Sequence, residues 1–305
     1  MTTQPILVMM AYRGGERFQR ALASLLDSQQ FFARIVVSVT APESSEDMRI
    51  AEHFQAESLN RMEVICTGVE LPTMQHQAFW IDYLESTGAK PSDWIYWLAY
   101  DDEVRATGVA ALIDSQGNWP LEQGTAYFGP WAMRHEQADA VWNGDREEDL
   151  ESWTSFPSEG PTRRPVMRWV RDQLAQPTYM QMSGSVCTLE SHQRLISSRP
   201  SKTGPMRIEM ATAAAVNNRF VEEFGEPVSI IYGRSNSDRA SYGKSARKED
   251  HHLLLWLCRY TLRHPNALPQ LLATAGDALR GYLGVLTRSR SLPEEEWRVR
   301  GIVSP

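Results

Sequence analysis

The feature that most constrains the fold is an apolar run that ends in three acids. Residues 94–99 read Trp-Ile-Tyr-Trp-Leu-Ala, and residues 100–103 read Tyr-Asp-Asp-Glu. The run follows a turn-forming Pro-Ser-Asp stretch at 91–93 and is typical of a strand that is buried on both faces. Open α/β sheets bind ligands at the carboxyl ends of such strands. The alternative is a solvated surface turn.

Strand and helix patterns alternate through the sequence before this run. Apolar stretches predict strands at 5–11, 34–39 and 62–66. Helices are predicted between them, the first with Phe18, Ala21, Leu22, Leu25 and Leu26 on one buried face. This alternation predicts right-handed βαβ units and a mostly parallel sheet flanked by helices.

The later elements are predicted from similar patterns. We expect a helix at 107–113, a polar surface excursion at 139–165 and a helical C-terminal extension. Strands are predicted at 125–133, 180–189 and 227–232, and a helix at 208–224. The predicted domains are an α/β domain over 1–248, with a nucleotide-binding half (1–112) and an acceptor-side half (113–248), and the extension over 249–305.

Composition narrows the class of protein. The chain has 305 residues, of which 42% are hydrophobic and 23% charged, as expected of a globular protein. A net charge of -7 argues against nucleic acid as the partner, because no excess of Lys and Arg neutralises phosphates. Three cysteines without Cys-x-x-Cys spacing indicate neither a zinc site nor a disulfide framework, and they favour a reducing compartment.

The expected localisation is cytoplasmic, because no signal sequence or apolar run of membrane-spanning length is found. The C-terminal extension carries an apolar stripe between Leu268 and Leu286. Packing on its own domain, a homodimer interface and peripheral contact with the inner face of a membrane are three alternatives for this stripe.

Adjacent carboxylates at a strand end suit a hard divalent cation. Mg²⁺ and Mn²⁺ prefer oxygen ligands and keep positions open for substrate phosphates. Without a metal, the two acids would repel a phosphate. A phosphate-containing ligand at Asp101 and Asp102 therefore implies Mn²⁺ or Mg²⁺.

Two stretches resemble the family 2 glycosyltransferases with the GT-A fold. The first is the strand, Gly-bearing turn and helix of residues 5–26, with Ala11-Tyr12-Arg13-Gly14-Gly15 at the turn. The second is Leu98-Ala99-Tyr100-Asp101-Asp102-Glu103, which is similar to the family's Asp-x-Asp region. The resemblance covers about residues 5–112 and implies a GT-A (Rossmann-like) central sheet.

The resemblance also implies roles for single residues. Asp102 would hold the metal, and Asp101 would contact the ribose or the metal shell. The nucleotide base pocket would be lined by Ala11, Tyr12 and Arg13. On the third helix, His76 or Gln77 would contact the nucleotide-sugar donor. The family's second strand usually ends in a base-reading aspartate, whereas this chain has Thr40 there, which can hydrogen-bond a base.

The catalytic base and a phosphate-binding loop are expected in the second half. Glu209 follows a Gly-containing stretch as the family's acceptor-side base does, and the alternative is a helix N-terminal Glu stabilised by the helix dipole. Arg234 and Arg239 lie in a basic loop that can close over a diphosphate, and the alternative is a solvated loop. Four tryptophans of the second half can offer faces for sugar rings, and core packing is the alternative for each: Trp131, Trp142, Trp153 and Trp169.

Together these features predict a metal-dependent, inverting hexosyltransferase. It would move a sugar from a nucleotide-diphosphate sugar to a saccharide or other hydroxyl acceptor, in cell-surface polysaccharide or glycoconjugate synthesis. Two alternatives stay open: a sugar nucleotidyltransferase and a non-catalytic GT-A-like binding protein. The last of these is raised by three departures from the family pattern: Ala99 in place of the first acid of the fuller motif, the missing base-reading acid and the missing His after the late strand.

Overall fold

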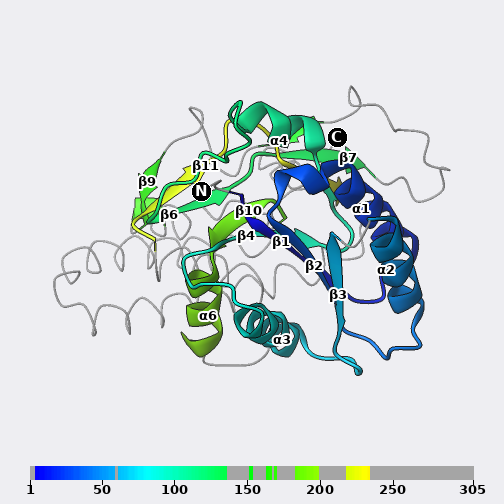
Figure 1. Ribbon diagram of the computed structural model, residues 1–305. Helices are drawn as coiled ribbons and strands as arrows, with labels where there is room; N and C mark the ends of the chain where they lie inside the picture. The colour runs from blue at the N-terminus through cyan, green and yellow to red at the C-terminus, as the bar shows by residue number, and fades with distance from the viewer. Residues whose placement is uncertain are drawn as a thin grey trace, which may run out of the picture.

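The computed structural model describes residues 4–58, 61–135, 151–153, 163–166, 168–169, 183–198 and 218–233 (Figure 1). The first half of the chain forms β1 (Ile6–Ala11), α1 (Gly15–Ser28), η1 (Gln29–Phe31), β2 (Arg34–Val39), α2 (Glu46–Glu57), β3 (Met62–Cys66), α3 (Thr73–Ser86), β4 (Trp94–Ala99), β5 (Glu103–Val104) and α4 (Ala106–Leu112). The described part of the second half forms β6 (Thr125–Phe128), β7 (Trp131–His135), β8 (Glu151–Trp153), β9 (Arg164–Pro165), β10 (Ser185–Thr188), α6 (Leu189–Ser198), β11 (Phe220–Glu223) and β12 (Ser229–Gly233).

The larger sheet has the strand order β3-β2-β1-β4-β10-β6-β11-β9. Its first four strands are parallel, and Met9 of β1 pairs with Val37 of β2 on one side and Leu98 of β4 on the other. β10 is antiparallel to both of its neighbours. The mostly parallel α/β sheet predicted from the sequence is therefore confirmed. Because parallel strands end at one edge, the segments after β1, β2, β3 and β4 lie close together there.

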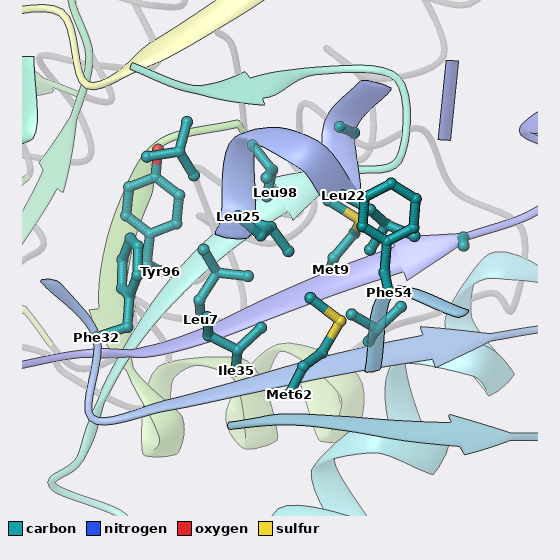
Figure 2. Close-up of a cluster of buried hydrophobic side chains, with 14 of the residues drawn as sticks. Leu7, Met9, Leu22, Leu25, Phe32, Ile35, Phe54, Met62, Tyr96 and Leu98 are labelled. Atoms are coloured by element: carbon teal, nitrogen blue, oxygen red, sulfur yellow. The ribbon is translucent and has the colours of Figure 1, made fainter. Parts of the chain in front are cut away.

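The sheet is covered by helices on both faces. Side chains alternate along β1, so that Leu7 and Met9 pack with α1 and α2 while Ile6 and Val8 pack with α3. Figure 1 shows α1 and α2 on one side of the sheet, and α3 and α6 on the other. Figure 2 shows the apolar cluster around Leu7 and Met9, in which side chains of α1 and α2 meet those of β1, β2 and β4. This burial on both faces explains why these strands read as unbroken apolar runs.

The strand predicted over 125–133 is instead two strands in two sheets. β6 belongs to the larger sheet, whereas β7 belongs to a second sheet with the order β5-β12-β7-β8. The division falls at Gly129 and Pro130. Proline has no backbone N–H to donate, so it interrupts the ladder where the chain changes sheets.

The prediction of a helix over 208–224 is wrong for its C-terminal end. Residues 220–223 instead form β11, which pairs in parallel with β6. Residues 208–217 lie outside the described part. The strand predicted over 180–189 is confirmed over Ser185–Thr188 as β10, whereas residues 183 and 184 form a turn. α6, which was not predicted, begins at Leu189 directly after β10. Trp131 and Trp169 are each 2% exposed, so both are core residues and neither presents a face to a sugar.

Candidate functional site

A tight turn presents the two aspartates at the carboxyl end of β4. The backbone N–H of Asp102 donates to the carbonyl of Ala99 at 3.3 Å, which places Tyr100 and Asp101 at the tip of the turn. Asp101 is partly exposed, whereas Asp102 is only 4% exposed. The two acids, which are indistinguishable in the sequence, therefore have different environments.

Asp102 forms hydrogen bonds inside the protein. Its carboxylate accepts from the hydroxyl of Ser183 and, at 3.3 Å, from the backbone N–H of Tyr232. The Ser183 hydroxyl in turn accepts the N–H of Ala99 at 3.0 Å. These bonds join the end of β4 to β12 and to the residue pair that precedes β10. Asp102 therefore fixes the turn that carries Asp101.

The third acid, Glu103, points into a different cluster. Its carboxylate pairs with Arg20 Nε of α1 at 3.1 Å and accepts from the hydroxyl of Tyr232. The Arg20 guanidinium also lies 3.7 Å from the centre of the Tyr232 ring. Burial and the adjacent carboxylate raise the pKa of Tyr232, so its hydroxyl remains a donor. This cluster attaches α1 to the smaller sheet behind the acidic turn.

The carboxylates at the turn fit a divalent cation whose remaining ligands come from the substrate. The described residues contain no group of three His, Cys, Asp or Glu side chains that could hold a metal. Mg²⁺ and Mn²⁺ are commonly held by one or two carboxylates together with phosphate oxygens. The resemblance assigns the metal to Asp102, but Asp102 is buried and hydrogen-bonded to Ser183 and Tyr232. The partly exposed Asp101 is therefore better placed to supply such a ligand, and Asp102 can orient it.

The loop between β1 and α1 packs against this turn. A Cβ on Gly14 would come within 2.7 Å of the Tyr100 ring and 2.5 Å of Phe18 Cβ, so the loop approaches the turn more closely than a side chain permits. The N–H groups of Gly14 and Gly15 donate to the buried Asp47 carboxylate at 3.1 to 3.2 Å. The structure thus brings the predicted base-pocket loop and the acidic turn to the same edge of the sheet.

Within that loop, Arg13 and Tyr12 bind an acid that the sequence did not single out. Arg13 donates to both carboxylate oxygens of Glu70, with a closest distance of 2.8 Å, and the Tyr12 hydroxyl donates to the same carboxylate at 3.2 Å. This hydrogen-bonded ion pair holds the pKa of Glu70 below its usual range and raises the pKa of Arg13. β2 lies between β1 and β3 in the sheet, so the pair spans the end of β2.

Thr40 lies at the end of β2, beneath this span. It is 2% exposed, and its hydroxyl accepts the N–H of Leu71 at 2.6 Å and donates to the carbonyl of Val69 at 3.3 Å. The N–H of Thr40 donates to the carbonyl of the fully buried Ala11 at 3.0 Å. Two of the residues predicted to touch the base, Thr40 and Ala11, therefore make internal bonds that shape the edge.

Similarity to known proteins is found at the level of structure and not of sequence. No protein-family model matches the sequence, and no curated protein matches it. The mannosyltransferase PcManGT from Pyrobaculum calidifontis, solved with GDP-Man and Mn²⁺, matches with a TM-score of 0.50 at 11% identity, over 99% of this chain and 80% of that one. The chain has a GT-A fold.

Two further solved structures are similar at lower scores. TarS of S. aureus has a TM-score of 0.48 at 13% identity and is covered over 50% of its length, so this chain spans half of it. GalNAc-T7, solved with UDP, GalNAc and Mn²⁺, has a TM-score of 0.47 at 10% identity, over 76% of this chain and 44% of that one.

In this GT-A fold, the two candidate donor contacts on α3 are core residues, each 2% exposed. His76 Nε2 lies 2.8 Å from the Ser38 hydroxyl, and burial lowers its pKa to about 4. The Gln77 amide lies 3.5 Å from Nδ1 of His192, whose pKa burial also lowers to about 4. Both histidines are therefore neutral at pH 7.

Three predicted residues, Glu209, Arg234 and Arg239, lie outside the described residues, as does the C-terminal extension. Their roles in a GT-A site remain predictions. No helix in the described part of the chain has the length and apolarity needed to cross a membrane.

Proposed function

We propose that this chain is an inverting glycosyltransferase that moves a sugar from a nucleotide-diphosphate sugar to a hydroxyl acceptor in polysaccharide or glycoconjugate synthesis. The observation that carries the proposal is the convergence of Tyr12, Arg13 and Asp101 at one edge of a GT-A sheet. A nucleotide diphosphate bound at a strand edge can use an aromatic ring and polar groups for its base and an accessible carboxylate for the cation on its phosphates. Tyr12, the Arg13–Glu70 pair and Asp101 are groups of these kinds.

The acidic turn supports the donor assignment. Asp101 would hold Mn²⁺ or Mg²⁺ while Asp102, fixed by Ser183, sets the position of the turn. When bound, such a cation neutralises charge on the departing diphosphate. PcManGT, which shares the fold, was solved with GDP-Man and Mn²⁺, and this agrees with a nucleotide sugar and a divalent cation as the ligands.

The reaction would be a single displacement. The acceptor oxygen would attack the anomeric carbon, the bond from that carbon to the diphosphate would break, and the acceptor proton would pass to Glu209. Arg234 and Arg239 would pair with the leaving phosphates. The role of Glu209 comes from the resemblance of the sequence to family 2 glycosyltransferases, and the role of Arg234 and Arg239 comes from the basic composition of their loop.

A ligand screen tests the proposal. Thermal unfolding is measured with UDP- and GDP-sugars, each with and without Mn²⁺, and binding to the native state must raise the midpoint. A rise that requires both components supports the proposal, and slow hydrolysis of the same donor would show catalysis. A rise only with a nucleoside triphosphate and a sugar phosphate, with release of pyrophosphate, would favour the nucleotidyltransferase alternative.

A further inference from the structure

The chain keeps a carboxylate at the predicted base pocket, but on a different strand from the one that usually supplies it. The family's base-reading acid follows the second strand, where this chain has Thr40. Glu70 follows the third strand and reaches over the end of β2 to Tyr12 and Arg13. Its side chain is 44% exposed, so a ligand at this edge can contact it.

Thr40 fixes the position of Glu70. The Thr40 hydroxyl bonds to the N–H of Leu71 and the carbonyl of Val69, the residues on either side of Glu70. Thr67 also donates to the Val69 carbonyl at 2.5 Å. The loop backbone is therefore held on both sides of the acid, and the residue that replaces the family's acid serves as the anchor for this one.

The other side of the pocket is shaped to hold the same carboxylate. Arg13 has a φ of 49°, which is uncommon for a residue with a side chain and marks a constrained position. Its guanidinium binds Glu70 in a fork. The Tyr12 hydroxyl is 3.2 Å from Glu70, long for an O–H···O bond, so it is the contact that an incoming N–H can most easily replace.

A carboxylate accepts hydrogen bonds and donates none. Uracil and guanine each present a ring N–H at their pairing edge, whereas cytosine and adenine present a ring lone pair there, which a carboxylate would repel. We propose that Glu70 is the specificity-determining residue of the base pocket and accepts the ring N–H of uracil or guanine, with the base stacked on the ring of Tyr12, a residue that is 39% exposed. The inference rests on the proposed function and deepens it.

Calorimetric binding of UDP, GDP, CDP and ADP, each with Mn²⁺, tests the inference on the full chain. Wild type is compared with Glu70→Gln, which offers one acceptor and one donor and so suits cytosine and adenine. Thr40→Val is the second variant, because it removes the anchor of the loop and retains the acid. The matched control is Glu52→Gln, which removes the same charge from an exposed site on α2.

Wild type should bind UDP or GDP more tightly than CDP and ADP. Whether UDP or GDP binds more tightly then identifies which of the two bases is used. Glu70→Gln should weaken UDP and GDP by about tenfold, the effect of one lost charged hydrogen bond, and should not weaken CDP or ADP. Thr40→Val should show a smaller loss with the same pattern, and Glu52→Gln none.

Three results would overturn the inference. If Glu70→Gln shifts all four affinities by one factor, Glu70 acts only through charge or as a latch. If it shifts none, Glu70 does not contact the base. If wild type binds none of the four, the proposed function fails as well, and this failure is recognised because it occurs before any substitution. Thermal unfolding of each variant shows that the chain is folded.

Discussion

The Ser183 hydroxyl donates a hydrogen bond to the Asp102 carboxylate across 81 positions of sequence. The same oxygen accepts the N–H of Ala99, the last residue of β4. One buried hydroxyl thus joins both ends of the turn that presents Asp101. Gly184 follows with a φ of 85°, and a Cβ there would come within 2.7 Å of Ser229 Oγ, so this corner has no space for a side chain.

The first prediction concerns this hydroxyl. Ser183→Ala removes one of the hydrogen bonds to the buried Asp102 carboxylate and the hydroxyl that accepts the Ala99 N–H, so we expect a loss of about 1–3 kcal/mol in the free energy of unfolding. Urea denaturation measures it. Ser92→Ala, in an exposed turn before β4, is the control and should change little. Equal stability of the two variants would contradict the structural role of Ser183.

The second prediction separates two neighbouring glycines. Gly14→Ala should destabilise the chain by about 1–3 kcal/mol, because its Cβ would overlap Phe18 and Tyr100. Gly15→Ala should cost about 1 kcal/mol from its φ of 53° alone, since nothing lies within 4 Å of its Cβ. The difference in unfolding free energy between the two variants is the test, and a larger loss at Gly15 would be inconsistent with the packed loop.

The first half of the fold could be predicted from the sequence because its signals are local. β1, β2 and β4 are buried on both faces and read as apolar runs, and the apolar side chains of α1 recur with helical spacing. The edge that carries Asp101 followed from strand order in α/β sheets. Predicting these elements therefore requires no information about residues that are distant in the sequence.

The second half depended on distant partners. β11 is a strand because it pairs with β6, which the sequence around Phe220 does not indicate, and a small-residue run at 211–215 suggested a helix instead. α6 is hard to predict because it starts directly after β10, and its first residue, Leu189, continues the apolar run of the strand.

The candidate site was predicted in outline but not in detail. Asp101 and Asp102 are adjacent in sequence, and only packing against Ser183 and Tyr232 distinguishes them. Glu70 is a single acid in a loop and carries no pattern. Its position after a parallel strand next to β2 was the one signal that could have found it.

The third prediction concerns pH. The pKa of His76 in the folded protein is about 4, below its ordinary value of 6.5, so the unfolded chain takes up a proton first as pH falls. Its contribution to stability is complete above pH 6.5 and is lost between pH 6.5 and 4. Between pH 7 and pH 5, we expect a loss of up to about 2 kcal/mol from this group.

Urea denaturation of His76→Gln at pH 7 and pH 5 checks this expectation. The variant should lose less stability between the two pH values than wild type does. His53→Gln, at an exposed histidine of α2, is the matched substitution control. A variant that loses as much as wild type would show that His76 is not buried in its neutral form.

The fourth prediction separates the roles of the two neighbouring aspartates. Asp102→Asn should lower stability by about 1–3 kcal/mol, because it disturbs buried hydrogen bonds to Ser183 and Tyr232. Asp101→Asn should keep the unfolding midpoint of wild type, because its side chain is partly exposed at the tip of the turn.

Calorimetric titration of the nucleoside diphosphate that wild type prefers, with and without Mn²⁺, tests the central claim most directly. Wild type should bind more tightly with Mn²⁺, and Asp101→Asn should lose that increase while remaining folded. Unchanged Mn²⁺-dependent affinity in Asp101→Asn would contradict the assignment of this carboxylate to the metal, and an absence of binding by wild type would contradict the glycosyltransferase proposal itself.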